Sequence, residues 1–304
     1  MLFRSVRERC GLEPDHATRL WNALGFASVA DDVRGFTDAD LEALQLTGQL
    51  LAQRAFDESE ELAVARILGQ TLGRLAEWQA DLLRRRTIVT GGTDPDALVA
   101  STEELVPALE RLQRYAWRRH LAAAATRMLA EVAGSATGDP VTTVGFADIV
   151  GFTTKSRKVS EPELRALLER FESSATTVVV RHGGRIVKSI GDEVLFVVDD
   201  VEAACATALA LRDEVRDDAG LLELRIGMAH GEVIPRYGDV YGPTVNLASR
   251  LTGHARPGTV LVDQHLAEAI RGRDTGHELR RVPTISVRGY AHLRPHALRR
   301  ASDR

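Results

Sequence analysis

Along the first 131 residues, apolar side chains recur at the spacing of one face of an α-helix. Leu105, Leu109, Leu112 and Ala116 follow this spacing in one long segment. Runs of β-branched residues, which would favour strands, are few in this part of the chain. The pattern therefore predicts an all-helical domain over residues 1–131.

Two polar pairs have the spacing of helix N-caps. Thr37 with Asp40 precedes LEALQLTGQLLAQRAF, and Ser101 with Glu104 precedes the long segment that ends at residue 131. Pro107 lies about two turns inside that second segment, where it would interrupt the backbone hydrogen bonds. We therefore expect the long helix to kink at Pro107 or to begin later.

The pattern changes at residues 132–140, VAGSATGDP, a run of small residues that we interpret as a short linker. Beyond it, strand-like runs alternate with amphipathic segments. Residues 141–148 predict a strand. The segment SEPELRALLERFESSATTVVVRH predicts a helix that opens with the capping-box pair Ser160 and Glu163.

The next segments complete the order of elements. Two strands, GRIVKSI and EVLFVV, are joined by a tight turn at Gly191-Asp192, and the helix VEAACATALALRDEVRD and the strand LLELRIGMAHGEV follow. The order βαββαβ is the ferredoxin-like arrangement, an α+β fold. A shorter portion has the helices PTVNLASRLTGHA and HLAEAIRG around the strand TVLVDQ, and then edge strands to about residue 298. The second predicted domain is residues 141–304.

Composition limits the classes of partner. Hydrophobic residues make up 44% of the 304 residues and charged residues 27%, as in soluble globular proteins. The formal net charge is −4, so we expect no nucleic-acid partner, and we interpret the short arginine clusters as solvated helix faces or tails. No apolar run approaches the ~20 residues of a transmembrane segment.

Cys10 and Cys205 are the two cysteines, and neither has the spacing of a zinc site or a disulfide framework. This usage is typical of a reducing compartment, so we expect a cytoplasmic location. The N-terminal MLFRSVRERCG is too short and too charged for a signal peptide. It begins within a helix-like pattern, so a longer native N-terminus stays an open alternative.

Two carboxylates are candidates for chemistry. Asp148 stands at the end of the strand 141–148, and Asp192 stands in the turn between the second and third strands. The ferredoxin-like topology places these two positions side by side. Two carboxylates without a nearby histidine or cysteine form an oxygen-ligand site, which suits Mg²⁺ or Mn²⁺. Ordinary turn chemistry explains Asp192 alone but accounts poorly for the pair.

A turn, Ile149-Val150-Gly151-Phe152-Thr153, follows Asp148 directly. The backbone N–H groups of such a turn can point at phosphate oxygens as an anion nest, and Gly151 permits close approach. The strand, the aspartate and the turn together predict a site for a metal-bound polyphosphate.

Three segments, FADIVGFT, KSIGDEVLF and GDVYGPTVNLASR, resemble the catalytic motifs of the class III nucleotidyl cyclases, which are the adenylyl and guanylyl cyclases. The resemblance covers residues 141–298, and the motifs occur in the family's order and at its spacing. It implies metal ligands at Asp148, Ile149 and Asp192, substrate-binding residues at Gly151, Phe152, Thr153, Lys188, Asp239 and Arg288, and catalytic residues at Asn246 and Arg250.

Lys188 and Asp239 match the pair that reads the purine in this family. Adenine donates from its N6 amine and accepts at N1, so an aspartate and a lysine fit it. Guanine presents the opposite pattern, and the mismatch would disfavour it. The pair therefore predicts ATP as the substrate and opposes the alternative of a guanylyl cyclase.

Asn246 and Arg250 lie four residues apart, on one face of a predicted helix. The resemblance implies that Asn246 orients the ribose and that Arg250 neutralises charge on the α-phosphate. The reaction is attack of the ribose 3′-oxygen on the α-phosphorus, which yields cyclic AMP and pyrophosphate, with two Mg²⁺ or Mn²⁺ ions per site. The family divides these residue sets between two subunits, which implies a homodimer.

Residues 1–131 resemble, less closely, the helical regulatory domain that precedes the cyclase domain in some actinobacterial members. We hypothesise that this domain controls the cyclase domain. His120 is a candidate pH sensor, although a solvent-facing helix histidine is the simpler interpretation. A lipid or another small molecule between these helices is a further candidate regulator, without a direct sign in the sequence.

Two other functions stay open. A catalytically inactive cyclase-like domain could bind nucleotide and signal through dimer geometry, although the complete set of polar residues argues against it. A diguanylate cyclase shares the βαββαβ core. Its Gly-Gly-Asp-Glu-Phe hairpin differs from SIGDEVLF here, and the TVNLASR helix has no counterpart in it.

Overall fold

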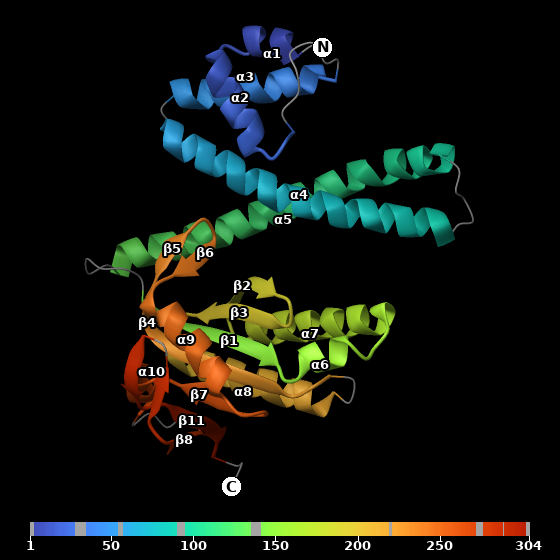
Figure 1. Ribbon diagram of the computed structural model, residues 1–304. Coiled ribbons are helices and arrows are strands. Elements are labelled where there is room, and N and C mark those ends of the chain that lie inside the picture. Colours follow the sequence, from blue (N-terminus) through green and yellow to red (C-terminus); the bar gives the residue numbers. More distant parts are fainter. Residues whose placement is uncertain are drawn as a thin grey trace. The chain divides into compact units, whose positions relative to one another are not determined.

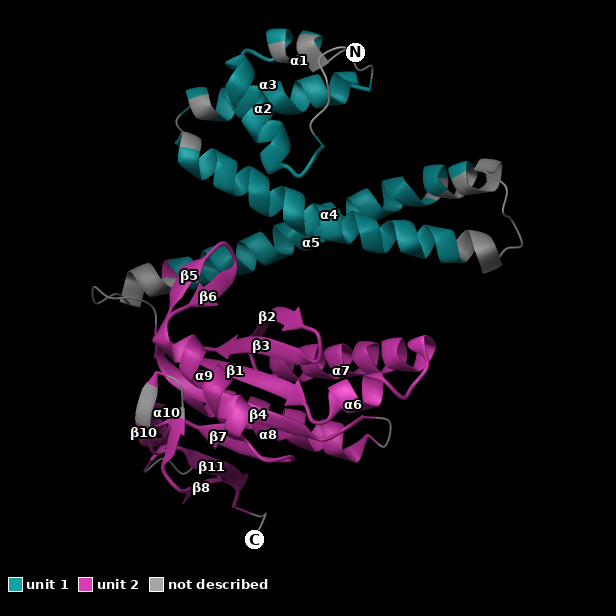
Figure 2. Ribbon diagram, in the orientation of Figure 1, with its two compact units in different colours: residues 1–128 teal, residues 129–304 magenta. Residues whose placement is uncertain are grey.

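The computed structural model describes residues 3–27, 35–53, 57–89, 95–134, 141–218, 221–271, 276–287 and 289–301. The chain divides into two compact units, residues 1–128 and 129–304, and the division falls inside the long helix α5 (Pro95–Gly134) (Figure 2). Of the predicted linker, residues 132–134 continue α5, whereas residues 135–140 lie outside the described part of the chain.

Unit 1 is helical in each of its described elements, which confirms the predicted fold class for this half of the chain. Its helices are α1 (Phe3–Arg9), α2 (Pro14–Ala23), α3 (Asp38–Ala52), α4 (Glu58–Val89) and α5 (Figure 1). A small core contains Val6, Leu20 and Leu44, all buried. The described helices include none with the length and apolar character to span a bilayer.

The first residues of α3 and α5 show which sequence signals mark the start of a helix. Thr37 precedes α3 as predicted, because its backbone N–H and its hydroxyl donate to Asp40 Oδ2 at 2.7 and 2.8 Å. The predicted start at Ser101 is wrong, because α5 begins at Pro95 and continues through Pro107. Proline fits the first turn of a helix, where its missing N–H would have no partner, and this favours Pro95 as the start.

Unit 2 contains a seven-stranded sheet in the order β2-β3-β1-β4-β7-β11-β8. The strands are β1 (Val141–Ile149), β2 (Arg185–Ile190), β3 (Glu193–Val198), β4 (Leu224–Glu232), β7 (Val260–Val262), β8 (His277–Arg281) and β11 (His296–Arg300). The helices are α6 (Phe152–Ser156), α7 (Glu161–Arg181), α8 (Val201–Asp217), α9 (Pro243–His254) and α10 (Gln264–Ile270). The predicted βαββαβ order is confirmed by β1, α7, β2, β3, α8 and β4.

One short hairpin, β5 (Ile234–Arg236) with β6 (Asp239–Tyr241), lies outside what the pattern predicts. A second hairpin, β9 (Ile285–Val287) with β10 (Tyr290–Leu293), lies where edge strands are predicted. The prediction of edge strands near residue 298 is wrong for β11, which pairs with both β7 and β8. A five-residue strand carries too few alternating positions to show whether it has one neighbour or two.

Strong local sequence signals predicted elements of unit 2 correctly. Ser160 and Glu163 form the predicted capping box at the start of α7, with hydrogen bonds of 2.8 and 2.7 Å from the Ser160 N–H and hydroxyl to Glu163 Oε2. Cys205 lies in α8 and is fully buried. The spacing of a capping box therefore located the helix that leads from β1 to β2.

Alternation along β1 assigns its side chains to two faces of the sheet. Ala147 and Ile149 join the core beneath α7 and α8, whereas Val144 and Phe146 join the core beneath α9. Figure 1 shows these helices on opposite sides of the sheet. Asp148 has the same parity as Phe146, so its side chain lies on the α9 face.

Candidate active site

Asp148 is the penultimate residue of β1 and is 8% exposed. The antiparallel registers place it opposite Glu193 of β3 on one side and opposite Arg225 of β4 on the other. Directly opposed residues project from the same face of a sheet. Three charged side chains therefore stand in a row at the end of the central strands.

Arg225 forms an ion pair with Asp148, from Nε to Oδ2. The guanidinium is half-exposed and stands beside a carboxylate that the sequence predicts to hold a cation. Sequence reasoning missed Arg225, because only the register of β1 against β4 brings it to Asp148. The signal that could have found it is the alignment of two predicted antiparallel strands, which periodicity alone does not give.

Asp192 lies in the turn between β2 and β3, next to Gly191, whose positive φ of 64° suits a tight turn. The Ile149 N–H donates to the Asp192 carbonyl at 3.1 Å, so this turn is fastened to the end of β1. Burial raises the pKa of Asp148, Arg225 opposes this rise, and the adjacent Asp192 carboxylate adds to it. The two predicted metal aspartates are thus neighbours.

The electrostatics fit a divalent cation. Burial, together with the charges of Asp148 and Asp192, raises the pKa of Glu193 to about 7. Crowded carboxylates of this kind are relieved by a bound cation. Within the described residues, no group of three or more acidic, histidine or cysteine side chains has a metal-binding arrangement. The site therefore offers two carboxylates, a number that Mg²⁺ accepts when phosphates and water complete its shell.

The turn after Asp148 departs from the prediction in part. The Val150 N–H donates to the Glu223 carbonyl at 2.9 Å, and the Ile149 N–H is also used inside the fold, so these two are not available to a phosphate. Gly151 has a φ of 75° and precedes α6, which begins at Phe152. The amides of Gly151, Phe152 and Thr153 donate no hydrogen bond to another described residue.

Lys188 and Asp239 are brought together from β2 and β6. Lys188 Nζ contacts Asp239 Oδ2 at 2.5 Å. Partial burial raises the pKa of Asp239, but hydrogen bonds from Lys188 and from the Val240 N–H outweigh that effect and hold the pKa below its ordinary value. The Asp239 carboxylate is therefore stabilised in its charged form, and the two side chains present a donor and an acceptor next to each other.

Asn246 and Arg250 are exposed on α9, and their four-residue separation places them on one face. The position of α9 is set by close packing on β4, because a Cβ at Gly227 would lie 2.2 Å from the Thr252 backbone nitrogen. Arg288, the predicted contact of the terminal phosphates, lies outside the described residues.

β4 starts beside Ile149 and ends with Glu232 beside Val141. Arg225 and the aspartate pair lie at its start, and the β5–β6 hairpin, with Asp239, follows its end. From there α9 runs back along the strand, because Thr252 near its C-terminus packs against Gly227. Among the described residues, no hydrogen bond or ion pair joins the Lys188–Asp239 pair to Asp148 or Asp192.

This combination of fold and site agrees with the sequence comparisons. The profile of the adenylate and guanylate cyclase catalytic domain matches residues 135–300. The chain therefore belongs to that family, the class III nucleotidyl cyclases.

Two relatives lead to the particular kind of cyclase. A protein named adenylate cyclase from Streptomyces coelicolor is 41% identical over 90% of this chain and 72% of its own length. Another of that name, from Glutamicibacter nicotianae, is 36% identical over 97% of this chain and 77% of its own length. The prediction of a class III adenylyl cyclase is thereby confirmed.

A solved structure agrees with the fold. The catalytic core of a rhodopsin-guanylyl cyclase with converted specificity, in complex with ATPαS, matches with a TM-score of 0.50 at 24% identity. The match covers 53% of this chain and 97% of that one. At this identity the likeness concerns the fold alone.

Proposed function

We propose that this chain converts ATP to 3′,5′-cyclic AMP and pyrophosphate at sites shared by two copies of the chain. The observation that carries the proposal is the meeting of Asp148 and Asp192 at the end of β1, on a fold of the cyclase family. The relatives named adenylate cyclase support ATP as the substrate.

Asp148 and Asp192, with the Ile149 carbonyl beside them, are the residues that would hold two Mg²⁺ or Mn²⁺ ions. When bound, such ions supply positive charge to the polyphosphate and favour loss of the ribose 3′-hydroxyl proton. The raised pKa of Asp148 is consistent with this role, because a carboxyl group crowded by Asp192 gains from added positive charge. Before a cation binds, the ion pair with Arg225 would fix the position of the Asp148 side chain.

Lys188 and Asp239 would read the adenine. Asp239 accepts from the N6 amine and Lys188 donates to N1, each with the charge state that the observed ion pair maintains. The pair is already assembled, so little ordering is needed when the base enters. Guanine would face a donor with its N1–H and an acceptor with its O6, which opposes GTP.

Asn246 and Arg250 would act on the ribose and the α-phosphate. Both point outward from α9, and no described residue of the same chain covers them as a binding site would. A second copy would supply its aspartate pair opposite these residues. Two half-sites per chain then form two complete sites in a two-fold dimer.

The function is tested by measuring cyclic AMP formed from Mn²⁺-ATP. Asp148→Asn and Asp192→Asn are each expected to lower kcat by about 100-fold or more, because the site loses charge that stabilises the transition state. Asp217→Asn, in an exposed side chain of α8, is the matched control and should retain activity. A wild-type chain that binds ATP but forms no cyclic AMP would instead support the inactive, signalling domain.

We also propose that unit 1 controls the cyclase unit and that a small apolar molecule is the regulator. A cavity of about 770 Å³ lies among α2, α3 and α4, with mostly apolar walls that include Leu24, Leu68 and Leu72. Glu61 contributes to the wall and is 2% exposed, and its Oε1 has no hydrogen-bond partner among the described residues. A ligand with a hydrogen-bond donor would satisfy that oxygen.

The candidate pH sensor has little support. His120 is exposed on α5, which agrees with the simpler interpretation of a solvent-facing histidine. We also propose a cytoplasmic location, because the two cysteines are buried and lie far apart in the sequence.

A further inference from the structure

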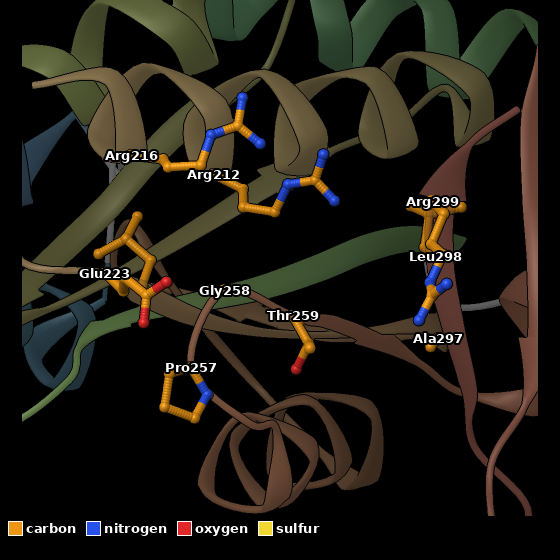
Figure 3. Close-up of a pocket in the computed structure, with 10 residues that line it drawn as sticks. Arg212, Arg216, Glu223, Pro257, Gly258, Thr259, Ala297, Leu298 and Arg299 are labelled. Atoms are coloured by element: carbon orange, nitrogen blue, oxygen red, sulfur yellow. The ribbon is translucent and has the colours of Figure 1, made fainter. Parts of the chain in front are cut away.

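A second cavity, of about 560 Å³, lies in unit 2 between α8, the loop before β7, and β11. Figure 3 shows Arg212 and Arg216 on α8 at one side of it and Arg299 on β11 at another. The loop with Gly258 and Thr259 closes the side opposite α8. Three arginines from two elements thus line one hollow.

Three arginines converge on one carboxylate beside this cavity. Arg212 and Arg216 both contact Asp213, at 2.7 and 3.3 Å, and Asp213 also pairs with Arg300 at 3.1 Å. One carboxylate is therefore shared among three arginines. Arg216 has a second acidic neighbour, Asp217, outside the lining of the cavity.

The backbone of Arg299 pairs with β8, but its side chain makes no hydrogen bond or ion pair to any described residue. Against the three lining arginines, the lining has one acidic side chain, Glu223. Arg212 is 9% exposed, so its charge is held in a place where water screens it weakly. A guanidinium in such a place is suited to bidentate binding of a phosphate or carboxylate.

The rest of the lining is apolar. Leu224, Pro257, Ala297 and Leu298 contribute to the walls, so a bare inorganic ion would leave much of the cavity uncovered. We propose that this cavity binds a small organic phosphate, with its phosphate group at Arg299 and its organic part against the apolar wall. The site is separate from the purine and metal residues described above.

The cavity adjoins the metal site through one short segment. Glu223 and Leu224 line it, and the next residue, Arg225, pairs with Asp148. The Glu223 carbonyl also accepts a hydrogen bond from the N–H of Val150, which lies in the turn after β1. A ligand in the cavity would therefore act on the segment that positions Arg225, and any effect on cyclase rate rests on the proposed function.

The test uses the full chain and ribose 5-phosphate as the probe, with binding measured by calorimetry. Arg299→Leu is expected to raise the Kd by about 10-fold, which is the loss of one charged hydrogen bond. Arg216→Gln, at a half-exposed position across the cavity from Arg299, is the second variant and should weaken binding in the same direction but by less, because it removes positive charge without removing the phosphate contact. Arg181→Leu, on the exposed side of α7, is the matched control and should leave the Kd unchanged.

Three results would overturn the proposal. They are an unchanged Kd in both Arg299→Leu and Arg216→Gln with thermal stability intact, a Kd that rises in Asn246→Ala instead, and inorganic phosphate binding as tightly as ribose 5-phosphate. The first two reject this location and the third rejects an organic ligand. Because binding is measured without turnover, these results stand apart from any failure of the cyclase assay.

Discussion

At the residue scale, the pair proposed to read the base is the clearest test of substrate choice. Lys188 and Asp239 contact each other, and together they offer a hydrogen-bond donor and an acceptor to one base. Their roles depend on hydrogen-bond direction, and this can be inverted without changing the backbone.

Lys188→Glu combined with Asp239→Ser is expected to lower kcat/KM for ATP by about 100-fold and to raise the GTP-to-ATP ratio, because each inverted hydrogen bond costs about 1–3 kcal/mol. Rates with both nucleotides provide the measurement. The charge reversal Arg181→Glu, at an exposed position of α7, serves as the control. An unchanged nucleotide ratio would mean that other residues read the base.

The residues also show what the sequence could predict. Asp148 and Asp192 were predictable, because a strand end and a hairpin turn are local features whose adjacency follows from the topology. Arg225 was not, because its contact with Asp148 depends on how β4 is aligned against β1. The use of the Ile149 and Val150 amides inside the fold was hidden for the same reason, since their acceptors lie far away in sequence.

At the element scale, the contact between α9 and β4 positions Asn246 and Arg250. Gly227→Ala is expected to lower the free energy of unfolding by about 1–3 kcal/mol, because a Cβ there would overlap the backbone of α9. Activity should fall with it, because the helix that carries both residues must shift. Denaturant unfolding and the cyclic AMP assay measure the two effects.

Gly253→Ala is the matched control on the same helix. A Cβ at Gly253 has open space around it, and alanine favours a helix by about 0.5–1 kcal/mol over glycine. This variant should be as stable as the wild type or more so. If both variants are equally destabilised, close backbone packing is not what holds α9.

Elements with strong local signals were predicted well, and short ones were not. The capping box at Ser160 located α7, and apolar periodicity located α8. The hairpin of β5 and β6 has three residues in each strand, too few to show alternation. The motif GDVYG therefore reads as a turn in the sequence, although Asp239 begins a strand.

At the scale of the whole molecule, the shared site can be tested by mixing inactive chains. Asp148→Ala and Asn246→Ala are each expected to be inactive, whereas their mixture should regain about a quarter of wild-type activity, since random pairing leaves one intact site in half of the dimers. Cyclic AMP formation measures the rescue. Mixed dimers that form but stay inactive would contradict a site shared between chains.

Three histidines of unit 2 predict how stability depends on pH. Burial lowers the pKa of His230, His277 and His296, and Asp263 partly opposes this for His230 and His296. A lowered folded-state pKa means that the unfolded chain binds more protons. The contribution of these neutral, buried histidines to the free energy of unfolding is therefore complete above the ordinary histidine pKa of ~6.5. It is lost as the pH falls below that value.

The histidines are expected to lower the melting temperature at about pH 5.5 relative to about pH 7.5, whereas Glu193, with its pKa raised to about 7, acts in the opposite direction. His296→Gln should therefore raise the melting temperature at about pH 5.5 relative to that at about pH 7.5 and so change the difference between the two, because one buried histidine no longer takes up a proton on unfolding. His120→Gln, at an exposed position of unit 1, should leave it as it is. A pH dependence that is the same in His296→Gln would assign the effect to other groups.

The sequence by itself determined the helical first half, the βαββαβ order and the pairing of Asp148 with Asp192, because periodicity, capping and motif spacing are properties of neighbouring residues. The tertiary structure alone decided that Arg225 stands against Asp148, that β11 lies inside the sheet, and that Arg212, Arg216 and Arg299 share one cavity. These depend on strand register and helix packing, which bring together residues that no local pattern connects.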